Sequence, residues 1–581
     1  MKNLIRLTTI IAGVAILLMM TQCSEDYLKI PQKGVLTLEN LTDPDDLEGF
    51  VISAYAFPNK QNFYYTNLPH YYGSVRSDDA YKGGGGGLND QIGWMQMELF
   101  SLCTSNINNF DFTWIGGYNA IARTNTALRQ LNSVSAEDYP LKEQRIAEMR
   151  FLRGYEYFQL KIYFRWIPYI DENLPANEYQ NQSNHPEGMS DLDLWQKILD
   201  DFTAAYEVLP PTQQEVGRPT KYAAEAFMVK TLMWMAFELD ENHQLVNVNT
   251  ARLTEALQHC NNIIGSGIYD LCEDFGQNFL CEYDNITPES IWELQCTIND
   301  GTNGMSLNRG LTLNTPTWNP WYRCCDFHKM SYNYVNSCRT TANGLPFFDD
   351  FNEVELKNNY YSYFGGNTFD VRLSHTAGIP NHPWKYNPDI LYDSIGTVHG
   401  ALYGYIHSMK EQNDPTNACQ WQNRFNSINV RVIRYSEVLL WKAEALIQLG
   451  REDEALPIIN SLRERAANSI EMLRFNDGTL PLNYNVQPYV DGVNCTWTNE
   501  YAWEAVMWET RMEYAGEGRR FFDLVRWGIA EEVMNGYLTK EKTRLEWITP
   551  GHFTAGRDEF LPIPEPEMVW SKGLFVQNPG Y

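Results

Sequence analysis

A run of charged residues near the C-terminal end of the chain is the part of the sequence best equipped for acid and base chemistry. Its members are Glu513, Glu517, Arg519, Arg520, Asp523 and Arg526. A glycosidase needs two carboxyl groups that face each other across a cleft, about 5 to 9 Å apart. Here the carboxylates alternate with arginines at helical spacing around a tight turn, which predicts ion pairs that lock a helix hairpin. Because such pairs lower carboxyl pKa values, the run is unsuited to a general acid, and we predict no catalytic residue.

A second group of reactive side chains lies in the middle of the chain. Cys324, Cys325, His328 and Cys338 could suggest a zinc site. The spacing matches no standard zinc finger, and adjacent cysteines rarely chelate one metal well. We therefore expect structural thiols or disulfides, whose pairing the sequence does not define, and we predict neither a metal nor another cofactor.

Aromatic side chains are the third group of residues in the sequence that could form a binding site. The chain contains 17 Trp, 35 Tyr and 27 Phe, and many of them fall in two irregular stretches, about 58–108 and about 271–430. A loop-rich interruption of this length is usually functional or disordered, and the aromatic content argues against disorder. Flat rings beside amide and carboxyl groups suit the apolar faces and hydroxyl rims of sugars. For any single ring, however, core packing is the more common role.

The elements that hold these loops are predicted to be paired helices. An Asp43-Pro44 start, Ser190 and Thr220 as N-caps, and apolar residues at helical spacing indicate helices over much of 43–264. The clearest pair covers 432–449 and 455–466 with Gly450 between them, and a further pair covers about 500–515 and 519–527. Short-loop helix hairpins of this kind favour a mostly α fold of tetratricopeptide-like stacked hairpins, although no strict 34-residue repeat is present.

Composition excludes several functional classes. The 581 residues carry a net charge of −28, which argues against a nucleic-acid partner and against adhesion to anionic lipid head groups. A mean hydropathy of −0.42 excludes a polytopic membrane protein.

The N-terminal residues predict export. Lys2 and Arg6 precede an uncharged apolar run from Leu7 to Met20, and Cys23 follows it. The run is too short for a membrane span and is typical of a signal peptide, which we place at 1–22. Cys23 would then be the acylated first residue of a mature lipoprotein, with palmitate among its acyl chains. Ordinary secretion with a nearby cleavage site is the alternative.

Several short motifs occur in a fixed order along almost the whole chain. They include Trp114-x3-Tyr118-x2-Ile121-x3-Asn125, Arg150-x2-Arg153-Gly154-Tyr155, Gly217-Arg218-Pro219-Thr220, Glu289-x-Ile291-x-Glu293, Arg434-Tyr435-Ser436-Glu437, Arg511-x-Glu513 and Leu561-Pro562-Ile563-Pro564. In number and order they resemble the SusD/RagB family of outer-membrane glycan-binding lipoproteins from bacterial polysaccharide-uptake systems. One departure is Arg165 after Tyr163-Phe164, where the family usually has a glycine after the tyrosine.

The resemblance implies a single SusD-like domain over 23–581. It would comprise a helical scaffold (about 40–270 and 430–530), a loop-rich ligand-side insertion (about 271–430) and an extended C-terminal tail (about 545–581). It also implies that loops before the Trp114 helix and in the insertion form the ligand site. The candidates chosen by this placement are Asp78, Asp79, Tyr81, Trp94, Trp318, Trp321, Tyr322, Tyr361 and Trp384.

The function that the resemblance implies is capture without catalysis. A surface lipoprotein of the outer membrane would bind a glycan and deliver it to a SusC-type TonB-dependent transporter. The alternatives are an exported α-helical glycoside hydrolase or lyase, and a related protein that binds peptides or another nutrient. The net charge makes a polyanionic glycan the less expected ligand, but Arg309, Arg323, Lys329 and Arg339 keep it open.

Overall fold

The structure is a computed structural model. It describes residues 41–56, 70–298, 301, 313–316, 322, 325–356, 360–393, 397–421 and 425–581. The predicted signal peptide and Cys23, as well as Trp318, Trp321, Arg309, Arg323 and Cys324, lie outside these residues.

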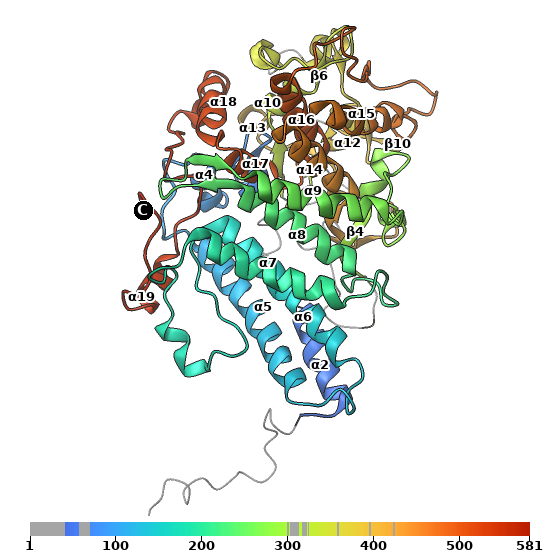
Figure 1. Cartoon of the computed structure of the whole chain (residues 1–581). Coiled ribbons are helices and arrows are strands. Elements are labelled where there is room, and N and C mark those ends of the chain that lie inside the picture. Colours follow the sequence, from blue (N-terminus) through green and yellow to red (C-terminus); the bar gives the residue numbers. More distant parts are fainter. Residues whose placement is uncertain are drawn as a thin grey trace, which may run out of the picture.

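The N-terminal part of the frame is a row of helices in which each helix packs against its neighbour in the sequence (Figure 1). These helices are α2 (Pro44–Tyr55), α5 (Asn108–Asn132), α6 (Lys142–Phe164), α7 (Asp191–Val208), α8 (Lys221–Ala236) and α9 (Thr250–Gly265). Two predicted caps are confirmed: Ser190 forms a capping box with Asp193, and the Thr220 side chain accepts a hydrogen bond from the Ala223 N–H. Asp43 precedes Pro44 at the start of α2 as predicted, but its side chain makes no cap hydrogen bond. Such caps satisfy N–H groups that the first helical turn leaves free.

The C-terminal part of the chain continues the row. Helix α9 packs against α14, and α14, α15 and α16 pack against one another, so the mostly α fold of stacked hairpins is confirmed. The helices are α14 (Tyr435–Gln448), α15 (Glu452–Asn468), α16 (Asn499–Tyr514), α17 (Arg520–Arg526), α18 (Ala530–Arg544) and α19 (Glu565–Trp570). Gly450 and Gly518 have φ values of 71° and 77°, a backbone region that glycine adopts without strain, and this allows the tight turns of both predicted pairs.

The loop-rich part contains short strands and short helices. Its main sheet is antiparallel and has the order β1-β5-β11-β8, with Ala80 opposite Met330 and His407 opposite Lys329. The strands are β1 (Ala80–Gly83), β5 (Phe327–Met330), β11 (His407–Ser408), β8 (Ala377–Gly378), β4 (Ser290–Leu294) with β14 (Val430–Arg434), β2 (Phe237–Leu239) with β3 (Leu245–Val248), β6 (Arg339–Thr340) with β7 (Thr368–Phe369), β9 (Pro383–Trp384) with β10 (Asn387–Leu391), and β12 (Gln420–Trp421) with β13 (Phe425–Asn426). The short helices are α4 (Ile92–Glu98), α10 (Tyr332–Ser337), α11 (Tyr360–Gly365), α12 (Arg372–Thr376) and α13 (Gly400–Tyr403).

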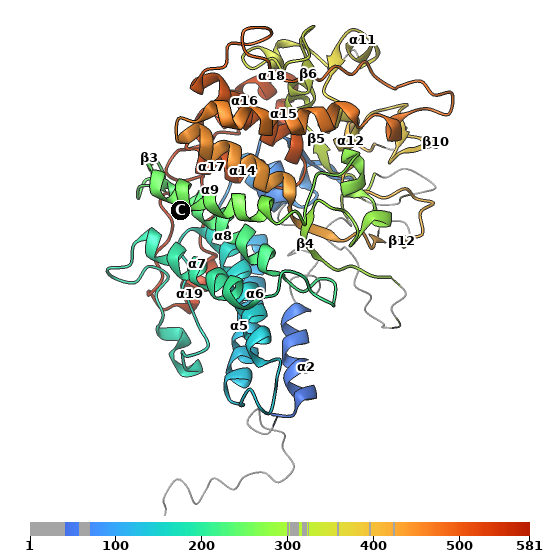
Figure 2. The ribbon, with the colours of Figure 1, turned by 45° about the vertical axis from the view of Figure 1, so that its right-hand side comes forward.

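Figure 2 shows how the two parts are arranged. Helices α2, α5 and α6 form one end of the molecule, whereas α11, α12, β6 and β10 lie at the opposite end beside α15 and α16. A disulfide between Cys281 and Cys419 joins two segments of the loop-rich part that are 138 residues apart in the sequence. Within the described residues, none of the helices combines the length and the apolar character that a membrane span requires.

Candidate functional site

A pocket of about 580 Å³ opens in the loop-rich part of the molecule. Its walls come from α11, the turn 379–382 before β9, Tyr405, and the stretch 475–483, which is about a hundred residues further along the chain. The aromatic side chains that line it are Tyr360, Tyr361, Phe364, Tyr405 and Phe475. A concave site with aromatic walls and a few polar groups is the usual form of a small-molecule or sugar site.

Tyr361 is the exposed ring of this pocket. Its side chain is 83% exposed, whereas Phe364 is 8% exposed and Tyr360 packs edge-on against Tyr405 with ring centroids 5.7 Å apart. Residues 360 and 364 are one helical turn apart and point to the interior from the same face of α11, so residue 361 must point outward. The short helix therefore anchors itself with the rings of Tyr360, Tyr363 and Phe364 and presents the ring of Tyr361 to solvent.

Neutral polar groups complete the lining. The Asn381 side-chain amide donates a hydrogen bond to the Tyr361 hydroxyl (3.1 Å), and the Asn381 N–H donates to the Tyr392 carbonyl (2.8 Å). Asn381 has a φ of 67°, a conformation that asparagine tolerates better than most residues, which explains this residue in the turn. The backbone carbonyl of Asn483 accepts from the Phe369 N–H (2.9 Å), while its side chain is exposed at the pocket.

The described lining of the pocket contains no Asp, Glu, Lys or Arg side chain. Its titratable imidazole, His382, has its pKa lowered to about 4 by burial, so that this ring is neutral at pH 7. An ion that entered would lose hydration without meeting an opposite charge, which is costly. The arrangement therefore suits a neutral ligand with an apolar face and hydroxyl groups.

Two of the nine candidates from the sequence, Asp78 and Asp79, are buried ion-pair partners. Asp78 lies 3.1 Å from Arg511 and accepts a hydrogen bond from Arg520 (3.0 Å), and Asp79 accepts one from Arg511 (3.0 Å). Burial opposes ionisation of Asp78, but Arg511 and Arg520 together hold its pKa below the ordinary value. The expectation that these carboxylates face a ligand is wrong for this structure, because the arginines of α16 and α17 bind them inside the protein.

Tyr81 and Trp94 are also buried instead of facing solvent. Tyr81 lies in β1, and its hydroxyl donates to Glu541 (2.5 Å). Trp94 lies in α4 and stacks on Tyr71 with ring centroids 3.7 Å apart. Large rings gain most free energy when they leave water, and here the interior accommodates both of them.

Tyr322 and Trp384 form a small core of their own together with Ile390, Tyr392 and Met409. The Trp384 Nε1–H donates to the Tyr322 hydroxyl (2.9 Å), and that hydroxyl donates to the Asn413 carbonyl. Both rings are buried, so they too differ from the expectation of exposed platforms. Of the nine candidates, Tyr361 lines the pocket; Trp318 and Trp321 lie outside the described residues.

Four basic residues were the reason for retaining the hypothesis of a polyanionic ligand. The two that the structure describes, Lys329 and Arg339, already have partners within the protein. Lys329 is buried and forms an ion pair with Asp326 (2.5 Å). Arg339 donates to Asn367 (3.1 Å) and to the Phe351 carbonyl (3.2 Å). Among the described residues, no group of three or more His, Cys, Asp or Glu side chains is placed to hold a metal ion.

The charged run near the C-terminus forms ion pairs, as its structural interpretation expects, but most of them join it to residues of other elements. Among the described residues, the pair inside the run is Asp523 with Arg526 (3.1 Å). Glu513 is buried between Arg465 (2.7 Å) and Arg434 (3.0 Å), and Glu517 lies 2.9 Å from Arg434. Burial raises the pKa of Glu513, but Arg465, Arg434 and Arg372 outweigh burial and bring it well below the ordinary value. A carboxyl group held ionised in this way is a poor general acid.

Sequence reasoning missed Asn381, His382, Phe475 and Asn483. A signal was present, because Asn-His and Asn-Asp-Gly are turn-forming sequences next to aromatic residues. Their positions depend on tertiary contacts: Asn483 bonds to Phe369 of β7, a distant segment, and Asn381 bonds to Tyr361 and to the Tyr392 carbonyl.

Two family models match the chain. The model described as "SusD family" matches residues 288–581, and the model described as "Starch-binding associating with outer membrane" matches residues 86–232. Among curated proteins, SusD-like protein P2 of Formosa agariphila is 23% identical over 475 residues, which cover 81% of this chain and 80% of that protein.

Solved structures have the same fold. A SusD superfamily protein from Bacteroides vulgatus superposes with a TM-score of 0.67 at 21% identity, over 93% of this chain and 99% of that chain. Surface glycan-binding protein A from Bacteroides thetaiotaomicron, in complex with laminarihexaose, superposes with a TM-score of 0.60 at 19% identity, over 92% of this chain and 100% of that chain.

Proposed function

Because this chain belongs to the SusD family, we propose that it binds a neutral oligosaccharide or polysaccharide in the pocket beside Tyr361. The observation that carries the proposal is an exposed ring at the rim of a pocket whose described lining has no charged side chain. The C–H face of a hexose would lie on the Tyr361 ring, and Asn381 and Asn483 would exchange hydrogen bonds with its hydroxyls. Solved relatives named as laminarin-binding and glycan-binding proteins support this ligand class.

In the cell, the protein would be a surface lipoprotein of the outer membrane. The acylated Cys23 would anchor it, and it would deliver the captured glycan to a SusC-type TonB-dependent transporter. Its family, the outer-membrane description of the second matching model and the lipoprotein-like N-terminus support this role. The protein would act without catalysis, since the carboxylates of its charged run are held ionised by arginines.

Calorimetry with the mature protein tests the ligand class. Neutral glycans, with laminarihexaose among them, should include a binder, whereas polygalacturonate and sulfated glycans should bind at least tenfold more weakly, which corresponds to about 1.4 kcal/mol. Tyr361→Ala should weaken binding of that neutral glycan at least tenfold while the unfolding temperature stays unchanged, because the ring is 83% exposed. Preferred binding of the acidic glycans would refute the neutral class.

The matched control is Trp570→Ala, which removes another exposed ring, 43% exposed, from α19. It should leave glycan affinity unchanged. Equal losses in both variants would show that the Tyr361 pocket is not the site. Release of sugar products during incubation with the glycans would instead support the hydrolase or lyase alternative, and binding confined to peptides would support the peptide alternative.

A further inference from the structure

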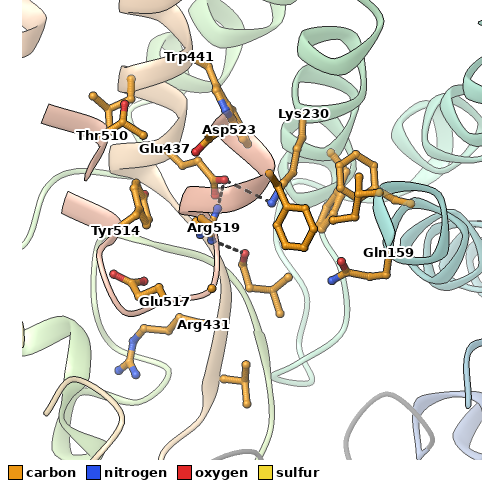
Figure 3. A pocket seen from close by; sticks show the side chains of 18 of the residues that line it. Gln159, Lys230, Arg431, Glu437, Trp441, Thr510, Tyr514, Glu517, Arg519 and Asp523 are labelled. Carbon is orange, nitrogen blue, oxygen red and sulfur yellow. Dashed lines mark hydrogen bonds and ion pairs between the residues drawn. The ribbon is translucent and has the colours of Figure 1, made fainter. Parts of the chain in front are cut away.

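A second cavity, of about 220 Å³, lies in the helical frame and has no part in the proposed glycan site. Figure 3 shows it between α6, which contributes Gln159, α8, which contributes Lys230, α14, which contributes Glu437 and Trp441, and the turn before α17. Residues 430–432 of β14 form another wall. The cavity thus joins helices from both halves of the frame.

One wall of this cavity is aromatic and surrounds an ammonium group. The Lys230 Nζ lies 5.6 Å from the ring centroid of Phe158, 5.8 Å from that of Phe227 and 5.9 Å from that of Trp441. The Lys230 side chain retains 21% exposure, so its charged end reaches the cavity. An apolar ligand body would therefore lie directly beside a cation.

Two cations in this wall share one carboxylate. Glu437 Oε1 lies 3.3 Å from Lys230 Nζ and also forms an ion pair with Arg519. The other carboxylates near them have their own partners. Asp523 and Glu444 bind Arg526, and Glu517 binds Lys410 (2.8 Å) and Arg434 (2.9 Å).

The pKa values agree with incomplete neutralisation at this wall. Burial and then Arg519 lower the pKa of Lys230 well below its ordinary value, against the opposing effect of Asp523. Burial and then Arg434 lower the pKa of Arg519 to about 9. An anion placed between these two cations would stabilise the charged form of both.

From this geometry we propose that the cavity binds a small organic carboxylate. Its carboxylate pairs with Lys230 and Arg519, and its body lies against Phe158, Phe227 and Trp441. Gln159 lines the same cavity and is placed to hydrogen-bond a polar substituent. A sugar acid and an aromatic acid share this chemistry, and the arms of the experiment distinguish them.

Calorimetry on the mature protein with four probes tests the proposal. Glucuronate and phenylacetate carry the carboxylate, while glucose and phenylacetamide are their uncharged counterparts. At least one acid should bind at least tenfold more tightly than its uncharged counterpart; glucuronate alone would identify a sugar-acid site, and phenylacetate alone an aromatic-acid site.

Variants locate the binding site. Lys230→Gln should weaken binding of the acid at least tenfold, Lys230→Arg should restore most of it, and Lys221→Gln should have no effect. Lys221 is the matched control because it begins the same helix and stacks on Tyr206, outside the cavity. Unfolding temperatures check that each variant is folded. If Lys230→Gln is unfolded, two other measurements test the proposal: the affinity of the parent protein for an acid against its uncharged counterpart, and the affinity of Lys230→Arg for the acid.

Several results would overturn the proposal. They are equal binding of an acid and its uncharged counterpart, no binding of either acid at millimolar concentration, and equal effects of Lys230→Gln and Lys221→Gln. Inorganic sulfate that displaces a bound acid as effectively as the acids themselves do would also overturn it. The glycan proposal is tested separately, because Tyr361→Ala should leave acid binding intact.

Discussion

The network around Glu513 and the pocket around Tyr361 are chemical opposites in one chain. The network buries four charged side chains, Glu289, Arg434, Arg465 and Glu513, all within ion-pair distance of their partners. The described pocket lining has no charged side chain and exposes a ring. The difference teaches that the sequence motifs with the strongest pattern hold the helices together, whereas the pocket that we propose for the ligand lies in loops that carry no such pattern.

The two regions differ because the network must stabilise the fold, whereas the pocket must remain available to a ligand. A buried charge is tolerated only if several partners compensate for its lost hydration, so the network must be complete and rigid. Arg434 shows this completeness, because it contacts Glu289, Glu513 and Glu517 at once. A ligand pocket must instead leave hydrogen-bonding groups and apolar surface available, and strong internal ion pairs would prevent this.

The largest expected effect comes from breaking the network. Glu513→Gln leaves the buried guanidiniums of Arg434 and Arg465 without their shared carboxylate, and we expect a loss of about 3–5 kcal/mol in the free energy of unfolding. Urea unfolding at pH 7 measures this loss. Because the folded-state pKa of Glu513 is lowered, the stabilisation is present above the ordinary carboxyl pKa of 4.5 and is lost as the pH falls toward the folded pKa.

The control for this prediction is Glu454→Gln, which removes an exposed ion pair with Arg451 on the surface of α15. Exposed pairs contribute little because water and salt screen them. A loss of stability as large as that of Glu513→Gln would mean that burial does not distinguish the two pairs.

A smaller loss of stability is expected from Asp78→Asn. The change weakens the contacts with Arg511 and Arg520, but Arg511 keeps a second carboxylate partner, Asp79, at 3.0 Å. We expect a lower unfolding temperature, measured by differential scanning calorimetry. The glycan dissociation constant, measured by isothermal titration calorimetry, should stay within twofold of the parent value. A tenfold loss of glycan affinity in a fully folded Asp78→Asn variant would show that this carboxylate contributes to ligand binding after all.

The next effect in size concerns the position of the Tyr361 ring. Asn381→Ala removes the amide that donates to the Tyr361 hydroxyl and one donor to the ligand, and both groups are exposed. We expect about threefold weaker glycan binding, or about 0.65 kcal/mol, which is less than for Tyr361→Ala. An effect larger than that of Tyr361→Ala would indicate that the amide, not the ring, is the main contact.

The smallest expected effect is that of pH on glycan binding. Because burial lowers the pKa of His382 to about 4, the pocket does not change charge between pH 5.5 and 8. The dissociation constant should therefore vary less than twofold over this range. A tenfold weakening toward pH 5.5 would mean that His382 or another group at the site becomes protonated there.

The helical frame was largely predictable from the sequence, whereas the candidate pocket was not. The caps Ser190 and Thr220 and the turn at Gly450 act within a few residues, so their signals are local. For Trp94 and Trp384 the sequence shows only a large ring in an irregular stretch, and burial depends on partners such as Tyr71 and Tyr322, which come from other segments. Tyr361 has the same local signal and is exposed instead.

The sequence by itself determined the stacked helix hairpins, because helical periodicity and caps act over one or two turns. It also indicated that the charged run forms ion pairs, but most of the partners, such as Arg434 and Arg465 for Glu513, come from other elements and were decided by the tertiary structure. Only the tertiary structure decided which rings meet solvent. Exposure depends on how α11, the turn 379–382 and the stretch 475–483 come together. The stretch 475–483 is joined to β7 by the hydrogen bond from the Phe369 N–H to the Asn483 carbonyl, and the turn is joined to α11 by the Asn381–Tyr361 hydrogen bond, contacts that no local pattern records.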